Sequence, residues 1–216
     1  MEGRSADTPR TQVLILAGGR GERLSPLTTS RPKPVISFGG VFRIIDFTLS
    51  NCLNSKVGPV ALLTQYGHDE IQRYIRCGWS SLWNTSFGPP PICLPPTSGK
   101  RYRGTADAVF QNLYLIQSNR SEHILILASD HVYQMDYRAL LAEHVARNAD
   151  VTIATVEHPV DGAENFGVVQ VGDDGQNYGI SGKAAAPTAG AVAFRRCTDK
   201  HGRLCLQKRC PCSSLT

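Results

Sequence analysis

The feature that most constrains the fold is a series of four short, largely apolar runs separated by segments with helical spacing. The runs are Val13–Leu16, Val60–Leu63, Ile124–Leu127 and Val151–Ala154. Apolar runs of this length are typical of parallel strands that are buried on both faces. The helical patterns fall in 42–53, 70–75, 106–116 and 137–145. This alternation predicts an α/β fold with a Rossmann-like, mostly parallel sheet and right-handed crossovers.

The segment from Trp79 to Arg103 interrupts this alternation. It holds five prolines and predicts a long surface loop, which is a candidate cover for the site. In parallel sheets, ligands bind at the carboxyl ends of the strands. We therefore expect the functional residues in the loops that follow Leu16, Leu63 and Leu127.

The charge of the chain is unevenly distributed. The net charge is +5, but residues 177–216 hold seven Lys/Arg and one acid, whereas residues 1–176 hold sixteen Lys/Arg and seventeen acids. The main part of the chain thus lacks the basic surface of a nucleic-acid binder. No run has the length of a membrane span, and the polar N-terminus has no apolar signal segment. We expect no membrane partner and a cytoplasmic location.

Four of the seven cysteines crowd the end of the chain, at positions 197, 205, 210 and 212. Their spacing lacks the paired C-x2-C units and the histidine partners of a zinc site. A zinc-binding tail is therefore disfavoured.

A glycine-rich loop follows the first predicted strand. It contains Gly18, Gly19, Arg20, Gly21 and Arg23, and Lys33 lies ten residues further on. Glycines allow backbone N–H groups to approach a phosphate closely, and the three cations would neutralise it. The spacing is neither that of the Rossmann fingerprint nor that of a P-loop. An ordinary turn with solvated cations is the alternative, but the coincidence with a buried strand favours triphosphate binding.

Asp130 comes directly after the third predicted strand, within the run Ala128-Ser129-Asp130-His131. A carboxylate at the carboxyl end of a strand, beside a cationic phosphate site, is well placed to hold Mg²⁺. The alternative is that Asp130 caps a following turn. Because the glycine-rich loop is also present, the metal-binding role of Asp130 is favoured over the capping role.

These motifs resemble a known family. Residues 16–24 read Leu-Ala-Gly-Gly-Arg-Gly-Glu-Arg-Leu, and Arg31-Pro32-Lys33-Pro34 follows, as in the sugar-1-phosphate nucleotidylyltransferases. Residues 38–51, 64–66 and 102–108 resemble the glucose-1-phosphate adenylyltransferases in particular, and Ser129-Asp130-His131 and Asn165-Phe166-Gly167-Val168 continue the match in order. The resemblance spans roughly residues 13–171. One departure is His68, where many relatives carry a small polar residue.

The resemblance implies a reaction and a set of roles. AMP would pass from ATP to α-D-glucose 1-phosphate by in-line attack, which gives ADP-glucose and pyrophosphate in the committed step of glycogen synthesis. Arg20, Arg23 and Lys33 would hold the triphosphate, and Asp130 would hold Mg²⁺. By the same resemblance, the adenine would be faced by Gln65, Gly104 and Thr105. The sugar phosphate would be contacted by Tyr102 and Gly167, and regulatory anions would be bound by Arg31 and Arg43. For Arg31 and Arg43, a solvated surface role is equally expected. Intact family members are expected to be homotetramers.

The resemblance fails beyond Val171. We expect a nucleotidyltransferase portion over 11–176, an out-of-frame and poorly ordered tail over 177–216, and no C-terminal β-helix domain. A one-nucleotide shift of inferred codons turns residues 177–184 into Ile-Thr-Gly-Phe-Gln-Glu-Lys-Pro, a stretch of the family type. Lys183 falls by coincidence near the family's lysine and receives no role. With the second metal-binding aspartate also missing, we expect the chain to be impaired or inactive.

Two other functions remain open at the level of sequence. One is transfer of a different nucleotide, giving a UDP-, dTDP- or GDP-sugar, and residues 42–51 and 102–108 argue against it. The other is a nucleotide-binding subunit without catalysis. The presence of Arg23, Lys33 and Asp130 argues against that reading.

Overall fold

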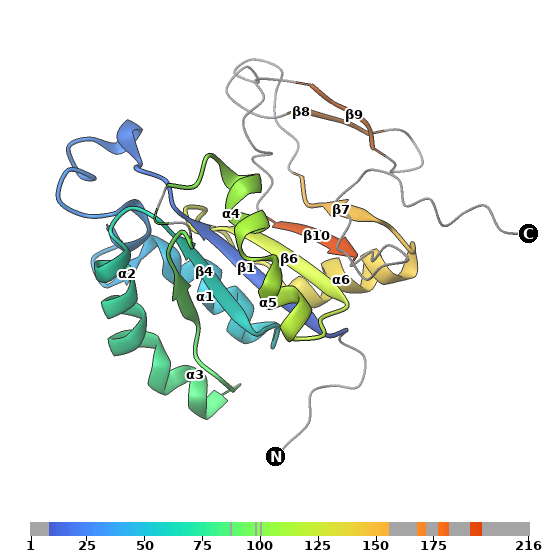
Figure 1. Cartoon of the computed structure of the whole chain (residues 1–216), viewed down its shortest axis with the longest axis horizontal. Helices are drawn as coiled ribbons and strands as arrows, with labels where there is room; N and C mark the ends of the chain where they lie inside the picture. Colours follow the sequence, from blue (N-terminus) through green and yellow to red (C-terminus); the bar gives the residue numbers. More distant parts are fainter. Residues whose placement is uncertain are drawn as a thin grey trace, which may run out of the picture.

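The computed structural model describes residues 9–86, 88–97, 99, 101–155, 168–171, 177–181 and 191–195. Its centre is a six-stranded sheet in the order β5-β4-β1-β6-β10-β7 (Figure 1). The strands are β1 (Thr11–Ala17), β4 (Val60–Thr64), β5 (Ile92–Leu94), β6 (His123–Ala128), β7 (Val151–Ile153) and β10 (Ala191–Arg195). β5, β4, β1 and β6 pair in parallel, and β10 pairs antiparallel with β6 and β7. The predicted α/β class with a mostly parallel sheet is confirmed, and all four predicted strands belong to this sheet.

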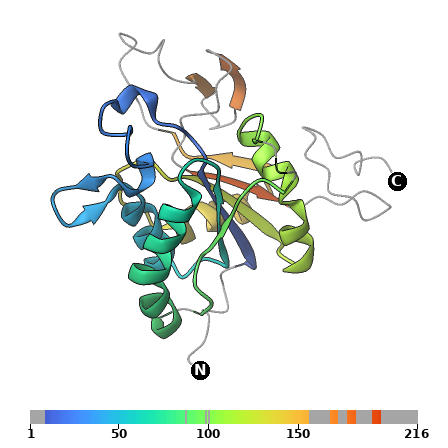
Figure 2. The same cartoon turned by 60° about the vertical axis from the view of Figure 1, so that its left-hand side comes forward.

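Two two-stranded sheets complete the strand inventory of the described residues. One is the hairpin of β2 (Ser37–Phe38) and β3 (Phe42–Arg43), which projects beside the helices in Figure 2. The other pairs β8 (Val168–Val171) with β9 (Asn177–Ser181) in antiparallel fashion.

The predicted helices form at the expected places. They are α1 (Ile44–Asn54), α2 (His68–Tyr74), α4 (Thr105–Gln111), α5 (Leu113–Ser118) and α6 (Tyr137–Ala146). The pattern predicted over 106–116 is split into α4 and α5 at Asn112, which leaves the helical region (φ −111°, ψ 17°). The buried Asn112 side chain donates from Nδ2 to the Ala108 carbonyl at 2.8 Å. This competition of a side chain with the helical backbone explains the break.

Successive strand residues point to opposite sides of the sheet, and here both sets are apolar, so helices cover both faces. The first face carries Val13, Ile15, Val60, Leu62, Leu125 and Leu127, which pack against α1, α6 and the tryptophans Trp79 and Trp83. The second face carries Leu14, Ala61, Leu63 and Ile124, which pack against α4 and α5. Figure 1 shows α4 and α5 in front of the sheet and α1 behind it. The chain is thus a three-layer α/β/α structure whose strands are buried on both sides.

The proline-rich segment differs from the predicted loop. Residues Ile75–Trp79 continue α2 as a π-helical turn, α3 spans Ser80–Ser86, and β5 is an edge strand of the sheet. Trp79 and Trp83 are buried, with ring centroids 6.1 Å apart, so their apolar area anchors the helical part. The prolines lie on either side of β5 at the sheet edge, where they remove few ladder hydrogen bonds.

Within the range 177–216, which the sequence analysis assigns to a tail, the described segments are strands β9 and β10. β9 pairs with β8, and β10 occupies a position between β6 and β7. An open strand edge can accept the backbone of many sequences, because the ladder hydrogen bonds come from main-chain groups. The domain boundary at residue 176, the poor order of the tail and the frameshift stay predictions.

None of the helices in the described part of the chain has both the length and the apolar character that a membrane span needs.

Asp46 ties the start of α1 to the helices beside it. Its buried carboxylate accepts hydrogen bonds from the Arg43 backbone N–H (2.7 Å), the Tyr74 hydroxyl (2.7 and 2.9 Å) and Trp79 Nε1 (2.8 Å). Burial, followed by the hydrogen bond to Asp46, raises the pKa of Tyr74, which therefore remains a donor at neutral pH. One carboxylate thus joins α1, α2 and the π-helical turn.

Replacing Asp46 tests this junction. We expect Asp46→Ala to lower the free energy of unfolding by about 2–4 kcal/mol, because donors from three residues lose their acceptor. Urea unfolding followed by circular dichroism measures the effect. Asp150→Ala removes an exposed carboxylate and is expected to change stability by less than about 0.5 kcal/mol. Equal losses in the two variants would contradict the role given to Asp46.

Candidate active site

The carboxyl ends of β1, β4 and β6 lie at one edge of the sheet. Their registers place Ala17 opposite Thr64, and Leu16 opposite Ala128. The loops that follow these strands therefore meet. They are the loops in which the functional residues are expected from the sequence.

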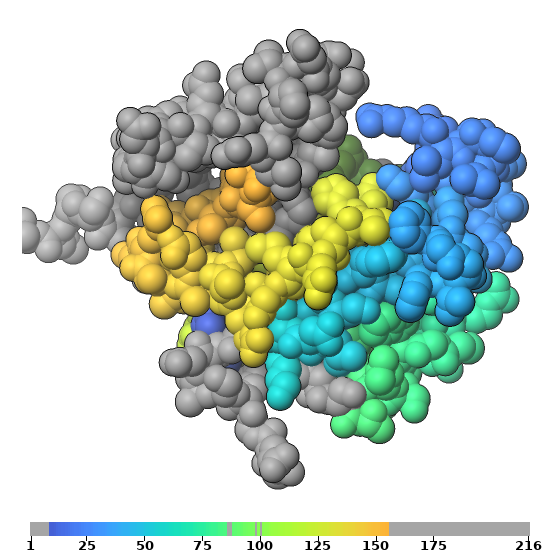
Figure 3. All heavy atoms as spheres, turned by 180° about the vertical axis from the view of Figure 1, so that it is seen from behind, coloured from blue at the N-terminus to red at the C-terminus, as the bar shows by residue number. Residues whose placement is uncertain are grey.

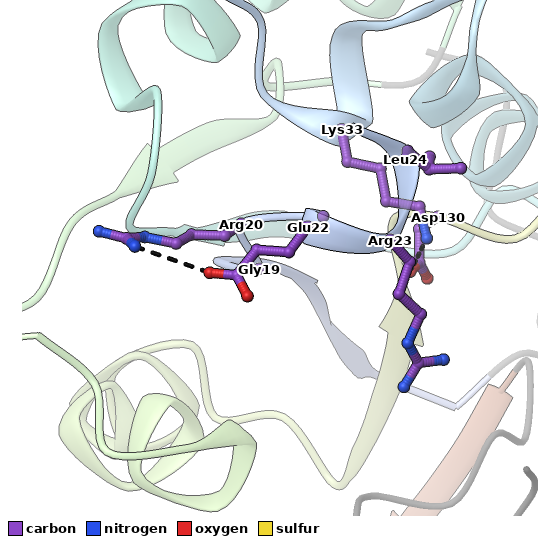
Figure 4. Close-up of a pocket in the computed structure, with 8 residues that line it drawn as sticks. Gly19, Arg20, Glu22, Arg23, Leu24, Lys33 and Asp130 are labelled. Atoms are coloured by element: carbon purple, nitrogen blue, oxygen red, sulfur yellow. Dashed lines mark hydrogen bonds and ion pairs between the residues drawn. The ribbon is translucent and has the colours of Figure 1, made fainter. Parts of the chain in front are cut away.

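A recess of about 360 Å³ opens at this edge (Figure 4). Its described lining combines three cations, two carboxylates and the glycine-rich turn, namely Gly19, Arg20, Gly21, Glu22, Arg23, Leu24, Lys33 and Asp130. Six of these eight residues are predicted site residues. The structure thus brings the glycine-rich loop, Lys33 and Asp130 together around one space, although they are up to 111 positions apart in the chain.

An ion pair between Lys33 and Asp130 closes one end of the recess. Lys33 Nζ lies 2.7 Å from Asp130 Oδ2, and Figure 4 shows the two side chains meeting. His131 Nε2 lies 3.9 Å from the other carboxylate oxygen. The Lys33 and Asp130 side chains are 28% and 39% exposed, so water screens the pair and its net contribution to stability is small, about 0–1 kcal/mol.

Backbone contacts and α1 fix the position of Asp130. The Ser129 backbone N–H donates to the Leu16 carbonyl at 3.2 Å, so the residue before Asp130 is still bound to β1. From α1, the Thr48 hydroxyl donates to the Ala128 carbonyl at 3.0 Å. Further along the helix, Asn51 donates to the Tyr133 carbonyl (3.1 Å) and accepts from the Met135 backbone N–H (3.3 Å). Figure 3 shows α1, in cyan, lying directly against this yellow segment.

The supporting residues Asp46, Thr48 and Asn51 were missed by reasoning about the site from sequence. They lie within the motif of residues 38–51, and all three are buried polar residues. A signal existed, because a polar side chain on the buried face of a helix needs a hydrogen-bond partner.

Gly21 shapes the turn that brings the cations together. Its φ of +70° lies in the left-handed region that favours glycine. A Cβ there would lie 2.9 Å from Thr28 Cγ2 and 3.0 Å from Lys33 Cβ. The Thr28 hydroxyl donates to the Gly21 carbonyl at 2.9 Å, which holds the loop closed. Gly21 therefore allows the Lys33 segment to pack against the turn.

The two arginines of the turn extend in different directions. In Figure 4, Arg20 extends away from Asp130, whereas Arg23 lies on the same side as Lys33 and Asp130. Arg20 pairs with Glu22 at 3.6 Å, and its guanidinium lies 4.8 Å from the centroid of the Tyr66 ring. The positive charge is thus spread along the recess, as an extended polyanion would require.

The residues predicted to face the base and the sugar lie near the recess but outside its described lining. Gln65 Oε1 accepts from the Tyr102 backbone N–H at 2.6 Å, and Gly18 lies against Gln65. The Tyr102 hydroxyl donates to the Leu94 carbonyl at 3.3 Å and accepts from Asn112 at 3.2 Å. Burial raises the pKa of Tyr102, so its hydroxyl remains a donor. Gly104 and Thr105 form the start of α4.

Arg31 and Arg43, the candidate regulatory residues, lie apart from the described lining of the recess. Arg31 Nε is 3.8 Å from Glu70 Oε1, and Arg43 lies 5.9 Å from the Tyr74 ring centroid and donates to Ser37 Oγ. Gly167, predicted to touch the sugar phosphate, falls outside the described residues.

The carboxylates of the recess are Asp130 and Glu22. The described residues contain no group of three His, Cys, Asp or Glu side chains that could hold a metal unaided. Mg²⁺ commonly uses one or two carboxylates together with substrate phosphates and water. Asp130 already holds a cation, the Lys33 ammonium, so its surroundings fit a metal that arrives with a phosphate ligand.

Comparison with known proteins decides the family. The model of the nucleotidyl transferase family matches residues 12–194, most of the chain. The chain belongs to the nucleotidyl transferase family. The match to this family continues beyond Val171, where the resemblance of the motifs ends.

Curated relatives of the family are similar at 44–50% identity. A glucose-1-phosphate adenylyltransferase 2 of Alkalilimnicola ehrlichii is 50% identical over 183 residues, covering 83% of this chain and 43% of the relative. A glucose-1-phosphate adenylyltransferase of Nitrosomonas europaea is 48% identical over 83% of this chain and 42% of its own length. A glucose-1-phosphate adenylyltransferase 2 of Vibrio cholerae is 44% identical, with coverages of 82% and 44%. The predicted homology is confirmed, and the chain spans about two fifths of the length of these relatives.

Gly67 offers a test of how the site loop is packed. Its φ is +63°, and a Cβ would lie 2.5 Å from Pro32 Cγ, next to Lys33. Gly39, at +62°, has no atom beyond its two chain neighbours within 4 Å of such a Cβ. We expect Gly39→Ala to cost about 1 kcal/mol from backbone strain alone. Gly67→Ala should cost about 1–3 kcal/mol more in urea unfolding, because the rigid proline must move. Similar losses in the two variants would contradict the proposed packing.

Proposed function

We propose that the chain is the nucleotide-binding part of a glucose-1-phosphate adenylyltransferase, which transfers AMP from ATP to α-D-glucose 1-phosphate and releases pyrophosphate. ADP-glucose made in this way commits glucose to glycogen synthesis. The names of the curated relatives support the substrates. The observation that carries the proposal is the recess in which three cations and Asp130 converge at the carboxyl ends of parallel strands.

In this proposal the protein acts by positioning the substrates and neutralising charge. Arg20, Arg23 and Lys33 bind the polyphosphate and stabilise the charge that develops on the departing pyrophosphate. The sugar phosphate oxygen attacks the α-phosphorus in line, and fixed placement of the two substrates removes much of the entropic barrier. Asp130 would hold Mg²⁺, which when bound supplies further neutralisation at the phosphate oxygens.

The assignments of Gln65, Gly104 and Thr105 to adenine, and of Tyr102 and Gly167 to the sugar phosphate, belong to the same proposal. Homotetramer formation, the cytoplasmic location, the out-of-frame tail and loss of activity also stay predictions. Sequencing the gene tests the frameshift, because its shifted frame must encode the expected family stretch.

Nucleotide specificity tests the main proposal. We expect ATP to bind more tightly than UTP, dTTP or GTP in isothermal titration calorimetry, and any pyrophosphate release with glucose 1-phosphate to follow the same order. Lys33→Ala and Arg23→Ala should each weaken ATP binding at least tenfold, and should lower any turnover by about 10²–10³. Arg76→Ala, which removes an exposed arginine on the π-helical turn, is the matched control. Preference for another nucleotide, or no nucleotide binding at all, would contradict the proposal.

The Lys33–Asp130 pair makes a second prediction. Asp130→Asn removes a negative charge from the recess and releases the Lys33 ammonium, so metal-free ATP should bind about 3- to 10-fold more tightly. The same variant should lose the enhancement of binding that Mg²⁺ gives to the unsubstituted chain. Calorimetry with EDTA, and then with Mg²⁺, measures both effects, and Asp150→Asn is the control. Weaker metal-free binding would contradict the charge argument.

A further inference from the structure

Tyr66 carries two guanidinium groups on one ring. The Cζ of Arg20 lies 4.8 Å from the ring centroid, and the Cζ of Arg101 lies 5.1 Å from it. Both distances fall within the range of a cation–π contact. The two guanidiniums come from the loop after β1 and from the segment before α4, and their distances to the ring centroid place them at most about 10 Å apart.

Arg101 is brought to this place by specific contacts of its neighbours. The backbone N–H of Tyr102 donates to the side chain of Gln65, the residue before Tyr66, at 2.6 Å. The Tyr102 hydroxyl is in turn bound to Leu94 and Asn112. The chain next to Arg101 is thus fixed to the end of β4, at the same edge of the sheet as the recess.

The charges around the ring are poorly balanced. Arg20 has one carboxylate partner among the described residues, Glu22, at the long distance of 3.6 Å. For Arg101, no carboxylate of the described chain lies within ion-pair distance, and the residue is exposed. By contrast, the nearby Arg103 is paired with Asp107 at 3.2 Å. Two cations on one ring with a single distant counter-charge attract an anion, and one as long as a triphosphate is of the length needed to reach from one guanidinium to the other.

We propose that Arg101 is a fourth cation of the polyphosphate site and that Tyr66 is the positioning residue that holds Arg20 and Arg101 together. Arg20 lines the recess, so an extended phosphate chain that leaves Lys33 and reaches Arg20 comes within range of Arg101. The ligand class is a nucleoside triphosphate or its pyrophosphate product. The inference rests on the proposed function and extends the same site.

Binding of inorganic triphosphate and of ATP, both in EDTA, tests the inference by calorimetry. Arg101→Ala should weaken both ligands about 5- to 20-fold, as expected for loss of a charge-assisted contact. Arg103→Ala, the matched control from the same segment, should stay within twofold of the unsubstituted chain. Tyr66→Phe keeps the aromatic ring and should bind normally, whereas Tyr66→Leu should weaken both ligands. Circular dichroism checks that each variant is folded.

The double variant Tyr66→Leu/Arg101→Ala separates positioning from a merely structural role. If Tyr66 acts by positioning the guanidiniums, the fold-loss of affinity in the double variant should be smaller than the product of the fold-losses in the two single variants. Equal affinities of Arg101→Ala and Arg103→Ala would overturn the inference while ATP binding by the unsubstituted chain still supports the proposed function. Loss of ATP affinity with unchanged triphosphate affinity would also overturn it, because the contact would then be to the nucleoside. If the unsubstituted chain binds neither ligand, both proposals fail.

Discussion

The site depends on the parallel pairing of β1 with a strand on each side. Parallel strands in register end at the same edge, so β4 and β6 deliver their loops next to the glycine-rich turn that follows β1. Strand pairing alone therefore brings residues that are far apart in the chain to one recess, and no contact between their side chains is needed to do so. A shift by one residue would exchange Val13 and Ile15 with Leu14 between two differently packed layers, so the packing of each layer fixes the register.

Helix α1 connects this core to the chemistry. Its apolar side chains pack on one face of the sheet, while Thr48 and Asn51 hold the chain on either side of Asp130. At its beginning, Asp46 binds Tyr74 and Trp79, so the helix is also tied to the elements beside β4. Residues 38–51, which resemble the family, thus have a physical reason for their buried polar side chains: these side chains orient the site rather than enter it.

Sequence alone predicted the features that depend on local pattern. Apolar runs marked the strands, and the coincidence of glycines with cations after a strand marked the turn that contains Gly21. The sequence could not predict contacts between residues that only folding brings together. Examples are the contact of Arg101 with Tyr66 and the hydrogen bonds by which Asn51 holds the segment after Asp130. The interpretation of 79–103 as a loop was wrong for α3 and β5, for a related reason. The prolines lie on either side of β5, whereas the helical part that precedes them holds none and is anchored by the buried Trp79 and Trp83.

The ion pairs of the recess show how a site can be organised before its ligand arrives. Lys33 with Asp130, and Arg20 with Glu22, place cations and carboxylates side by side in partly exposed positions. Such pairs contribute little to stability, so breaking them costs little. They nevertheless hold the cations close to the places where phosphates would bind, and they limit repulsion among like charges. In the proposed function, a polyphosphate bound to these cations would leave the carboxylates of Asp130 and Glu22 facing the same space, and Asp130 would hold a metal ion there.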